Sequence, residues 1–154
     1  MSRWVRCAAS AVALTGLLFC GAQTASGSDT PSVTLTIKIE NVSRQGGLVQ
    51  VALYDRASYD GHDQAPVAQT VVDARAPETV VTLPGVRPGV YAVKMFQDFH
   101  RSGAFERSAL GIPEEPFGFS NDALPFLDQP SFDATKFNLA SGSNLIVVHL
   151  RSLP

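Results

Sequence analysis

Apolar and polar side chains alternate along the first part of this chain, and this feature restricts its fold more than any other. The alternation runs over residues 33–40 and returns over residues 49–53. A period of two places successive side chains on opposite faces of an extended strand, so each segment is predicted to be a half-buried β-strand. Turn residues at 43–47 separate the two segments. The sequence therefore predicts a β-hairpin.

Further strands are predicted along the rest of the chain, separated by turn residues. The segment 90–96 has the strongest pattern of a central strand, and a Pro-Gly turn at 88–89 precedes it. The polar segment 54–68 is expected to be a long loop that can hold a short helix. The other predicted strands are 70–73, 79–83, 132–139 and 145–150.

The spacing of these strands indicates the fold class. No window of the sequence shows sustained helical periodicity. Several short strands with fairly regular turn signals between them are typical of two packed sheets. We therefore expect an all-β domain, an antiparallel β-sandwich of about seven strands with an immunoglobulin-like or transthyretin-like arrangement.

The N-terminal residues follow the pattern of a secretory signal peptide. Arg3 and Arg6 give a positive start, the apolar run 7–20 follows, and small residues up to Ala25 offer cleavage points. The apolar run is shorter than the ~20 residues that a membrane-spanning helix needs. No later segment is long enough either, so no transmembrane segment is expected.

The chain is accordingly interpreted as three parts: a signal peptide at 1–25, a flexible linker at 26–31 and a single β-sandwich domain at 32–154. Both cysteines, Cys7 and Cys20, belong to the signal. The mature chain is therefore expected to have no disulfide and no thiolate metal site. It is expected to be secreted or periplasmic.

A lipoprotein signal is the competing interpretation of the same segment, because Cys20 stands where such signals carry a lipid. Phe19 directly precedes that cysteine, whereas lipoprotein signals usually place a small residue there. A lipid-anchored form is therefore not expected.

The charge of the mature chain restricts the classes of partner. After removal of the signal, 10 of the 12 basic residues remain against 14 acidic ones, a formal charge of −4. A mildly acidic surface without a basic run argues against nucleic acid and against anionic membranes. We expect a monomer that binds an unknown envelope protein or a glycan.

Function is expected in the stretch that begins at the central strand and runs to residue 122. This stretch contains a buried strand, a polar loop at 98–106 and an aromatic, glycine-containing loop at 111–122. The two loops are expected to lie side by side at one end of the sandwich.

These residues resemble a known family. The matching residues are Leu83-Pro84, Pro88 to Val93, Asp98, Gly111-Ile112-Pro113, Gly118-Phe119-Ser120-Asn121 and Pro130 to Ala134. They look like the bacterial secreted family called domain of unknown function 2141, over roughly Leu48 to Leu150. The resemblance implies a secreted β-sandwich whose biochemical role is unassigned.

The loop at 98–106 is the candidate metal site. Relatives tend to carry a calcium-like loop here, and Asp98, Gly103 and Glu106 match its first, turn and last positions, while His100 and Ser102 replace asparagines. Calcium needs six to eight oxygen ligands, and imidazole suits a transition metal better. The alternative is that Asp98 and Ser102 form hydrogen bonds to their own loop, as in Asx-turns. No cofactor is expected apart from calcium as a weak candidate.

No catalytic residue is assigned from the sequence. Ser120 lies in a segment similar to a nucleophile elbow, but Asp122 replaces the closing glycine, so Ser120 is expected to cap its loop. Glu114 and Glu115 are adjacent, and adjacent side chains of an extended chain point in opposite directions, so both are expected to be solvated rather than paired for acid–base work. A hydrolase that uses Glu114 or Ser120 remains a third interpretation.

A non-catalytic binding module is the favoured interpretation, and its candidate residues are Phe117, Phe119, Asn121 and Asp122. Aromatic residues on a glycine-containing loop form apolar pockets or patches for a partner. The alternative is that the phenylalanines fold back onto the sandwich and hold the long loop in place.

Overall fold

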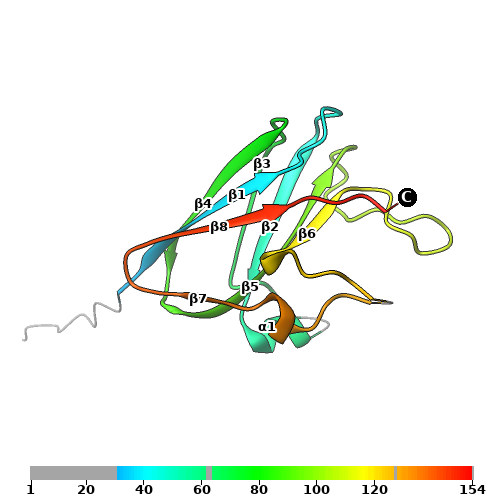
Figure 1. The fold of residues 1–154 in the computed structure, drawn as a ribbon. Helices are drawn as coiled ribbons and strands as arrows, with labels where there is room; N and C mark the ends of the chain where they lie inside the picture. The colour runs from blue at the N-terminus through cyan, green and yellow to red at the C-terminus, as the bar shows by residue number, and fades with distance from the viewer. Residues whose placement is uncertain (1–30, 62–63, 127, 154) are drawn as a thin grey trace, which may run out of the picture.

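The computed structural model describes residues 31–61, 64–126 and 128–153. It contains a three-stranded sheet and a five-stranded sheet that pack against each other (Figure 1). The expected all-β sandwich is confirmed. The expected signal peptide lies outside the described residues, as does nearly all of the expected linker. Within the described part of the chain, no helix is long and apolar enough to cross a membrane.

The three-stranded sheet has the order β4–β1–β8, with β1 (Val33–Glu40) in the centre. Strand β4 (Glu78–Val86) pairs with β1 antiparallel, whereas β8 (Ser143–His149) pairs with β1 parallel. This parallel pair differs from the purely antiparallel expectation. It arises because the chain enters β8 from the other sheet and not from a hairpin with β1.

The five-stranded sheet has the order β3–β2–β5–β6, and β7 pairs with the first residues of β5. The bounds of its strands are β2 Leu48–Tyr54, β3 Ala68–Asp73, β5 Gly89–Asp98, β6 Phe117–Phe119 and β7 Phe137–Leu139. The predicted central strand is confirmed as β5, which is hydrogen-bonded to β2, β6 and β7. The expected β-hairpin of residues 33–40 and 49–53 is wrong, because the turn between β1 and β2 carries the chain from one sheet to the other and the two strands do not pair.

The hydrophobic core lies between the sheets and is built from the alternating apolar positions that the sequence shows. Leu35, Ile37 and Ile39 on β1 are fully buried, and Val93 on β5 is fully buried from the other sheet. The inward side chains of β2 belong to the same cluster. Because successive side chains of a strand point to opposite faces, the other side chains of β2 and β5 are directed to the outer face of their sheet.

Two short helices cover one end of the molecule. Helix α1 (Arg56–Asp60) begins at the N-cap Asp55, whose carboxylate accepts a hydrogen bond from the backbone of Ser58. Helix α2 (Phe132–Thr135) begins at the N-cap Ser131. The expected strand at 132–139 is therefore wrong in its first half, because the serine cap starts a helical turn there before β7 begins.

The segment at 117–119 also differs from expectation, because it is strand β6 and not part of a loop. Its three residues pair with residues 94–96 of β5. A three-residue strand is too short to show a period of two in the sequence, and only this pairing defines it. A 3-10 turn, η1 (Ser120–Asp122), follows directly.

Candidate functional site

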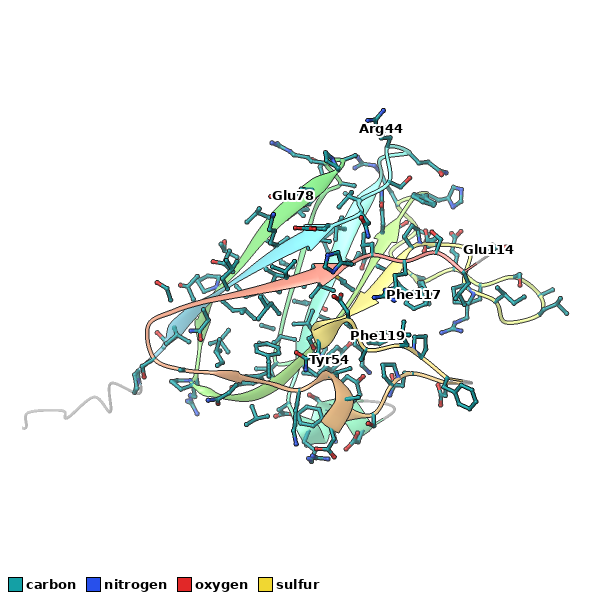
Figure 2. The ribbon with its side chains drawn as sticks, viewed as in Figure 1. Arg44, Tyr54, Glu78, Glu114, Phe117 and Phe119 are labelled. Carbon is teal, nitrogen blue, oxygen red and sulfur yellow. The ribbon has the colours of Figure 1, made fainter. Side chains whose placement is uncertain are left out.

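The outer face of the five-stranded sheet carries a pocket of about 520 Å³. Its floor is formed by outward side chains of β2, β5 and β6, and its rim by the loops at 105–113 and 125–129. Tyr54, Phe119 and Phe117 belong to this floor, and the strand register places them opposite Ala92, Lys94 and Phe96 of β5 (Figure 2).

A row of phenylalanine rings forms one wall of the pocket. The ring centroids of Phe96 and Phe105 are 5.3 Å apart, those of Phe105 and Phe117 5.8 Å, and those of Phe117 and Phe119 6.0 Å. The last two pairs are edge-to-face, an arrangement that aromatic pairs prefer, whereas the planes of Phe96 and Phe105 are tilted by 54°. Phe117 is only 7% exposed, so it also holds β6 in place, as the sequence alternative proposed.

Lys94 provides a positive charge in the floor of the pocket. Its Nζ lies 4.5 Å from the ring centroid of Tyr54 and 4.0 Å from that of Tyr59, and it donates a hydrogen bond of 2.8 Å to Gln129 Oε1. Burial lowers the pKa of Lys94, because the charged form loses water. Among the described residues, no carboxylate oxygen lies within 4.0 Å of its Nζ.

Arg107 provides a second positive charge at the rim. Its guanidinium carbon lies 5.0 Å from the ring centroid of Phe105, and Nη1 donates a hydrogen bond of 3.1 Å to the carbonyl oxygen of Gly111. No described carboxylate forms an ion pair with it within 4.0 Å. The pocket therefore combines an aromatic wall with two cations whose charge is not neutralised by a direct partner.

Glu115 connects the loop at 111–122, to which it belongs, with the loop at 98–106. It is 1% exposed, and its two carboxylate oxygens accept hydrogen bonds from the backbone N–H groups of Phe99 at 2.9 Å and Glu106 at 3.1 Å. The loops therefore lie side by side as expected. The expectation that Glu115 is solvated was wrong, whereas its neighbour Glu114 is exposed.

Asp98 has the structural role that the sequence alternative described. It is fully buried, and its carboxylate accepts hydrogen bonds from the backbone N–H groups of Ser102 at 3.0 Å and Gly103 at 2.9 Å and from Gln50 Nε2 at 2.9 Å. Burial alone would raise the pKa of Asp98, but these donors together lower it below its ordinary value. Ser102 Oγ donates a hydrogen bond to the carbonyl oxygen of Ala104 at 3.1 Å.

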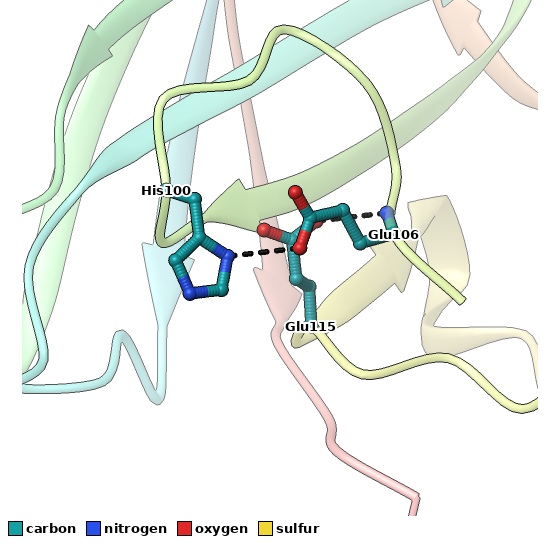
Figure 3. Close-up of side chains that lie close together, drawn as sticks. All are labelled: His100, Glu106 and Glu115. Atoms are coloured by element: carbon teal, nitrogen blue, oxygen red, sulfur yellow. Dashed lines mark hydrogen bonds and ion pairs between the residues drawn. The ribbon is translucent and has the colours of Figure 1, made fainter. Parts of the chain in front are cut away.

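Two of the four candidate metal residues lie close together, with a third partner that the sequence did not indicate. His100 Nδ1 is 2.8 Å from Glu106 Oε2, and one ligand atom each of His100, Glu106 and Glu115 lies within 4.8 Å of the others (Figure 3). Asp98 is not part of this group, and the hydroxyl of Ser102 is hydrogen-bonded to Ala104. No short-range pattern marks Glu115, because its position depends on the pairing of two loops.

The remaining candidates bind neighbouring segments of the chain. Ser120 is 1% exposed; its hydroxyl accepts a hydrogen bond from Val93 N and donates one to the carbonyl oxygen of Thr135. Asn121 Nδ2 donates to the carbonyl oxygens of residues 134 and 136. The carboxylate of Asp122 accepts a hydrogen bond from the backbone N–H of His149 at 2.9 Å and lies 2.7 Å from His149 Nδ1.

The four candidate binding residues are therefore divided by the structure. Phe117 and Phe119 line the pocket, whereas Asn121 and Asp122 lie outside it.

Comparison with known proteins identifies the family. Neither the curated proteins nor the solved structures gave a match to this chain. The profile of the family described as "Uncharacterized protein conserved in bacteria (DUF2141)" matches residues 37–147, which span β1 to β8 and include every residue of the aromatic row. The chain belongs to this family, domain of unknown function 2141.

Proposed function

We propose that this chain is a secreted or periplasmic, non-catalytic binding module that takes a small amphipathic anion into the pocket on its five-stranded sheet. The single observation that carries the proposal is the position of Lys94 and Arg107 beside a continuous aromatic wall, with no carboxylate within ion-pair distance among the described residues. The ligand would have an aromatic or aliphatic body and one carboxylate, sulfonate or phosphate group.

The aromatic wall would pack against the apolar part of the ligand. A pocket of about 520 Å³ has the size of small-molecule sites. Burial of apolar surface against the wall stabilises a complex by ~25 cal/mol per Å². Phe119 is only partly buried, so part of its ring is free to contact a ligand. Phe96 and Phe105 complete the wall and keep the rings in fixed positions.

The two cations, Lys94 and Arg107, would bind the anionic group of the ligand. Lys94 has lost water on burial, and its direct partners are an amide oxygen and two aromatic rings, while Asp60 and Asp128 attract it from beyond ion-pair distance. An anion that enters the pocket would supply the missing opposite charge in a site of low dielectric, where the attraction is strong. Asp128 also lines the pocket and attracts Lys94 from beyond ion-pair distance. It would disfavour ligands with several negative charges.

The state of the remaining polar groups supports a non-catalytic role. The hydroxyl of Ser120 is buried, accepts one hydrogen bond and donates another, and Ser120 does not line the pocket. The carboxylates of Asp98 and Glu115 accept backbone N–H groups that hold the loops. These groups stabilise the scaffold around the pocket.

The secreted location is supported by residues 1–25, whose pattern is that of a signal peptide. Mass spectrometry of the exported protein is expected to give a free amino terminus between Gly21 and Thr30. A diacylated Cys20 would show that the chain is a lipoprotein, and an uncleaved chain in the cytoplasm would show that it is not exported.

A matched pair of fluorescent probes tests the ligand class. Anilinonaphthalene sulfonate is an aromatic anion, and phenylnaphthylamine has the same rings without the sulfonate. We expect saturable binding of one sulfonate probe per chain and weaker binding of the neutral probe.

Two variants remove the positive charges one at a time. Lys94→Met replaces the ammonium group with an uncharged side chain of similar length, and Arg107→Gln replaces the guanidinium with an uncharged polar group. Each change is expected to reduce sulfonate affinity about tenfold, or ~1.4 kcal/mol, and to leave the neutral probe unaffected.

Controls separate the pocket from general surface effects. Phe119→Ala is expected to weaken the binding of both probes. Arg44→Gln removes a cation in the turn between β1 and β2, far from the pocket, and should change the affinity for neither probe (Figure 2). Circular dichroism of each variant must match that of the parent chain, because the sulfonate probe also binds partly unfolded states. Equal affinity for the two probes would overturn the proposal. An affinity for the sulfonate probe that stays unchanged in both Lys94→Met and Arg107→Gln would also overturn it. So would a neutral glycan or an envelope protein that binds through Phe119 independently of both cations.

A further inference from the structure

Three metal-ligating side chains from separate parts of the chain meet outside the pocket. His100 follows β5, Glu106 ends the same loop, and Glu115 lies just before β6 (Figure 3). One donor atom from each side chain lies within 4.8 Å of the other two. His100 Nδ1 lies 2.8 Å from Glu106 Oε2. Metal ligands need such a convergence of donor atoms on one point in space.

The buried carboxylate of Glu115 is an independent observation that favours a cation here. It is 1% exposed, yet among the described residues no lysine, arginine or histidine nitrogen lies within 4.0 Å of it. Two backbone N–H groups are its hydrogen-bond partners. Each carboxylate oxygen has two acceptor positions, so one on each oxygen is still available. Burial of a carboxylate without an opposite charge is costly, and a bound cation removes that cost.

We propose that His100, Glu106 and Glu115 bind a divalent transition-metal ion of the zinc class. One imidazole nitrogen and two carboxylate oxygens are ligands that zinc accepts in tetrahedral sites, and three protein ligands leave one position for water. The backbone N–H groups of Phe99 and Glu106 that hold the Glu115 carboxylate in place would orient it toward the ion.

The same geometry argues against calcium. Calcium needs six to eight oxygen ligands, and this group offers two carboxylates and an imidazole. The carboxylate of Asp98, which the calcium-loop pattern would use first, accepts three hydrogen bonds from its own surroundings. The side chain of Ser102 is directed to the carbonyl oxygen of Ala104.

A bound ion would also fix one side of the pocket. Glu106 lies between Phe105 and Arg107, and both of these neighbours line the pocket. Because successive side chains of an extended segment point to opposite sides, Glu106 can bind the ion while its neighbours face the ligand. The ion would connect the loop at 99–106 to Glu115, which lies two residues before the start of the pocket strand β6.

Isothermal titration calorimetry of the full chain tests the proposal. The protein is prepared without a polyhistidine tag and with Cys7→Ser and Cys20→Ser, because both imidazole and thiolate ligands bind zinc. After treatment with a chelator, it is titrated with Zn²⁺, Ni²⁺ and Ca²⁺. We expect one Zn²⁺ or Ni²⁺ per chain, an increase in Tm on addition of the ion, and no saturable heat with Ca²⁺.

Variants identify the ligands. His100 is the most exposed of the three, with a side chain that is 67% exposed, so His100→Ala should preserve the fold. His100→Ala and Glu106→Gln are each expected to weaken binding at least tenfold. Glu114→Gln changes the exposed neighbour of Glu115 and should have no effect, and His149→Gln should also bind normally. The proposal would be overturned if His100→Ala and Glu106→Gln bound the ion with unchanged affinity. It would also be overturned if only His149→Gln lost binding, or if the parent chain showed no saturable binding.

Discussion

The hydroxyl oxygen of Ser120 accepts a hydrogen bond of 2.9 Å from the backbone N–H of Val93, at the point where β6 stops pairing with β5. The next residue pair along this ladder would be Val93 and Ser120, but the chain turns into η1 there. The serine side chain therefore replaces the backbone acceptor that a longer strand would have provided. This bond joins the central strand to the end of the pocket strand.

Replacement of Ser120 by alanine is expected to destabilise the protein by about 1 to 3 kcal/mol, because it leaves the buried N–H of Val93 without an acceptor. Urea denaturation followed by fluorescence or circular dichroism measures the change. Ser141→Ala, at an exposed turn, is the matched control and should stay close to the parent chain. Equal stability of the two variants would show that a water molecule or a local shift satisfies the Val93 N–H.

Val93 itself tests the position of the core. It is fully buried on β5, whereas Val80 on β4 is 57% exposed. Val93→Ala is expected to cost about 1 to 3 kcal/mol through lost apolar contacts and the cavity that remains. Val80→Ala should change stability by less than ~0.5 kcal/mol. Similar small effects in denaturant melts would contradict a core between the two sheets at Val93.

Asp98 should make stability depend on pH in the acid range. Its folded-state pKa is below the ordinary value of 3.8, because backbone N–H groups of Gly103 and Ser102 and the amide of Gln50 outweigh the effect of burial. A depressed carboxyl pKa stabilises the folded state above the unfolded-state pKa, and this stabilisation is lost as the pH falls through the folded-state pKa. Protons then favour the unfolded chain.

The variant Asp98→Asn is therefore expected to be less stable than the parent chain at neutral pH. Between about pH 5 and pH 2 its stability should fall less steeply than that of the parent chain, so the two curves approach each other in acid. Denaturation midpoints across this range measure the effect. Glu114→Gln removes an exposed carboxylate and should leave the slope of the parent chain unchanged. Parallel curves for Asp98→Asn and the parent chain would contradict the assigned hydrogen bonds.

The turn after β1 offers a pair of adjacent glycines with different surroundings. Gly46 and Gly47 both have a positive φ, of 80° and 89°. A Cβ at Gly46 would meet no atom within 4 Å, whereas a Cβ at Gly47 would overlap the carbonyl oxygen of Asp98. Gly46→Ala should cost about 1 kcal/mol of backbone strain. Gly47→Ala should cost about 3 kcal/mol or more, because the end of β5 must also move.

Thermal or urea denaturation of the two alanine variants measures this difference. Equal costs would mean that the turn does not pack against the end of β5. The comparison needs no further control, because the two substitutions share the same strain and differ in the contact alone.

Local chain geometry explains which parts of the fold were predictable. Residues 33–40 and 90–96 were identified as strands because the side-chain period of a strand is a property of a few consecutive residues. The segment 132–139 was predicted as a strand throughout, and the Ser131 cap made its first half helical. The parallel partner of β1 was not predictable, because no local pattern shows which strand lies beside which.

The candidate site shows the same division. Phe117 and Phe119 were identified because aromatic residues on a glycine-containing loop form apolar pockets or patches, although the strand β6 that holds them was not predicted. The prediction for Glu115 failed because alternation shows only that Glu114 and Glu115 point to opposite sides, and the N–H donors of Phe99 and Glu106 come from another loop.

By itself, the sequence determined most of the strands and turns and one pair of aromatic residues in the site, since these depend on neighbours along the chain. Only the tertiary structure placed Lys94, Phe105 and Arg107 around that pair and brought His100 to Glu115. The physical reason is that strand register and loop pairing are set by contacts between residues far apart in the sequence, through burial and backbone hydrogen bonds that no short window contains.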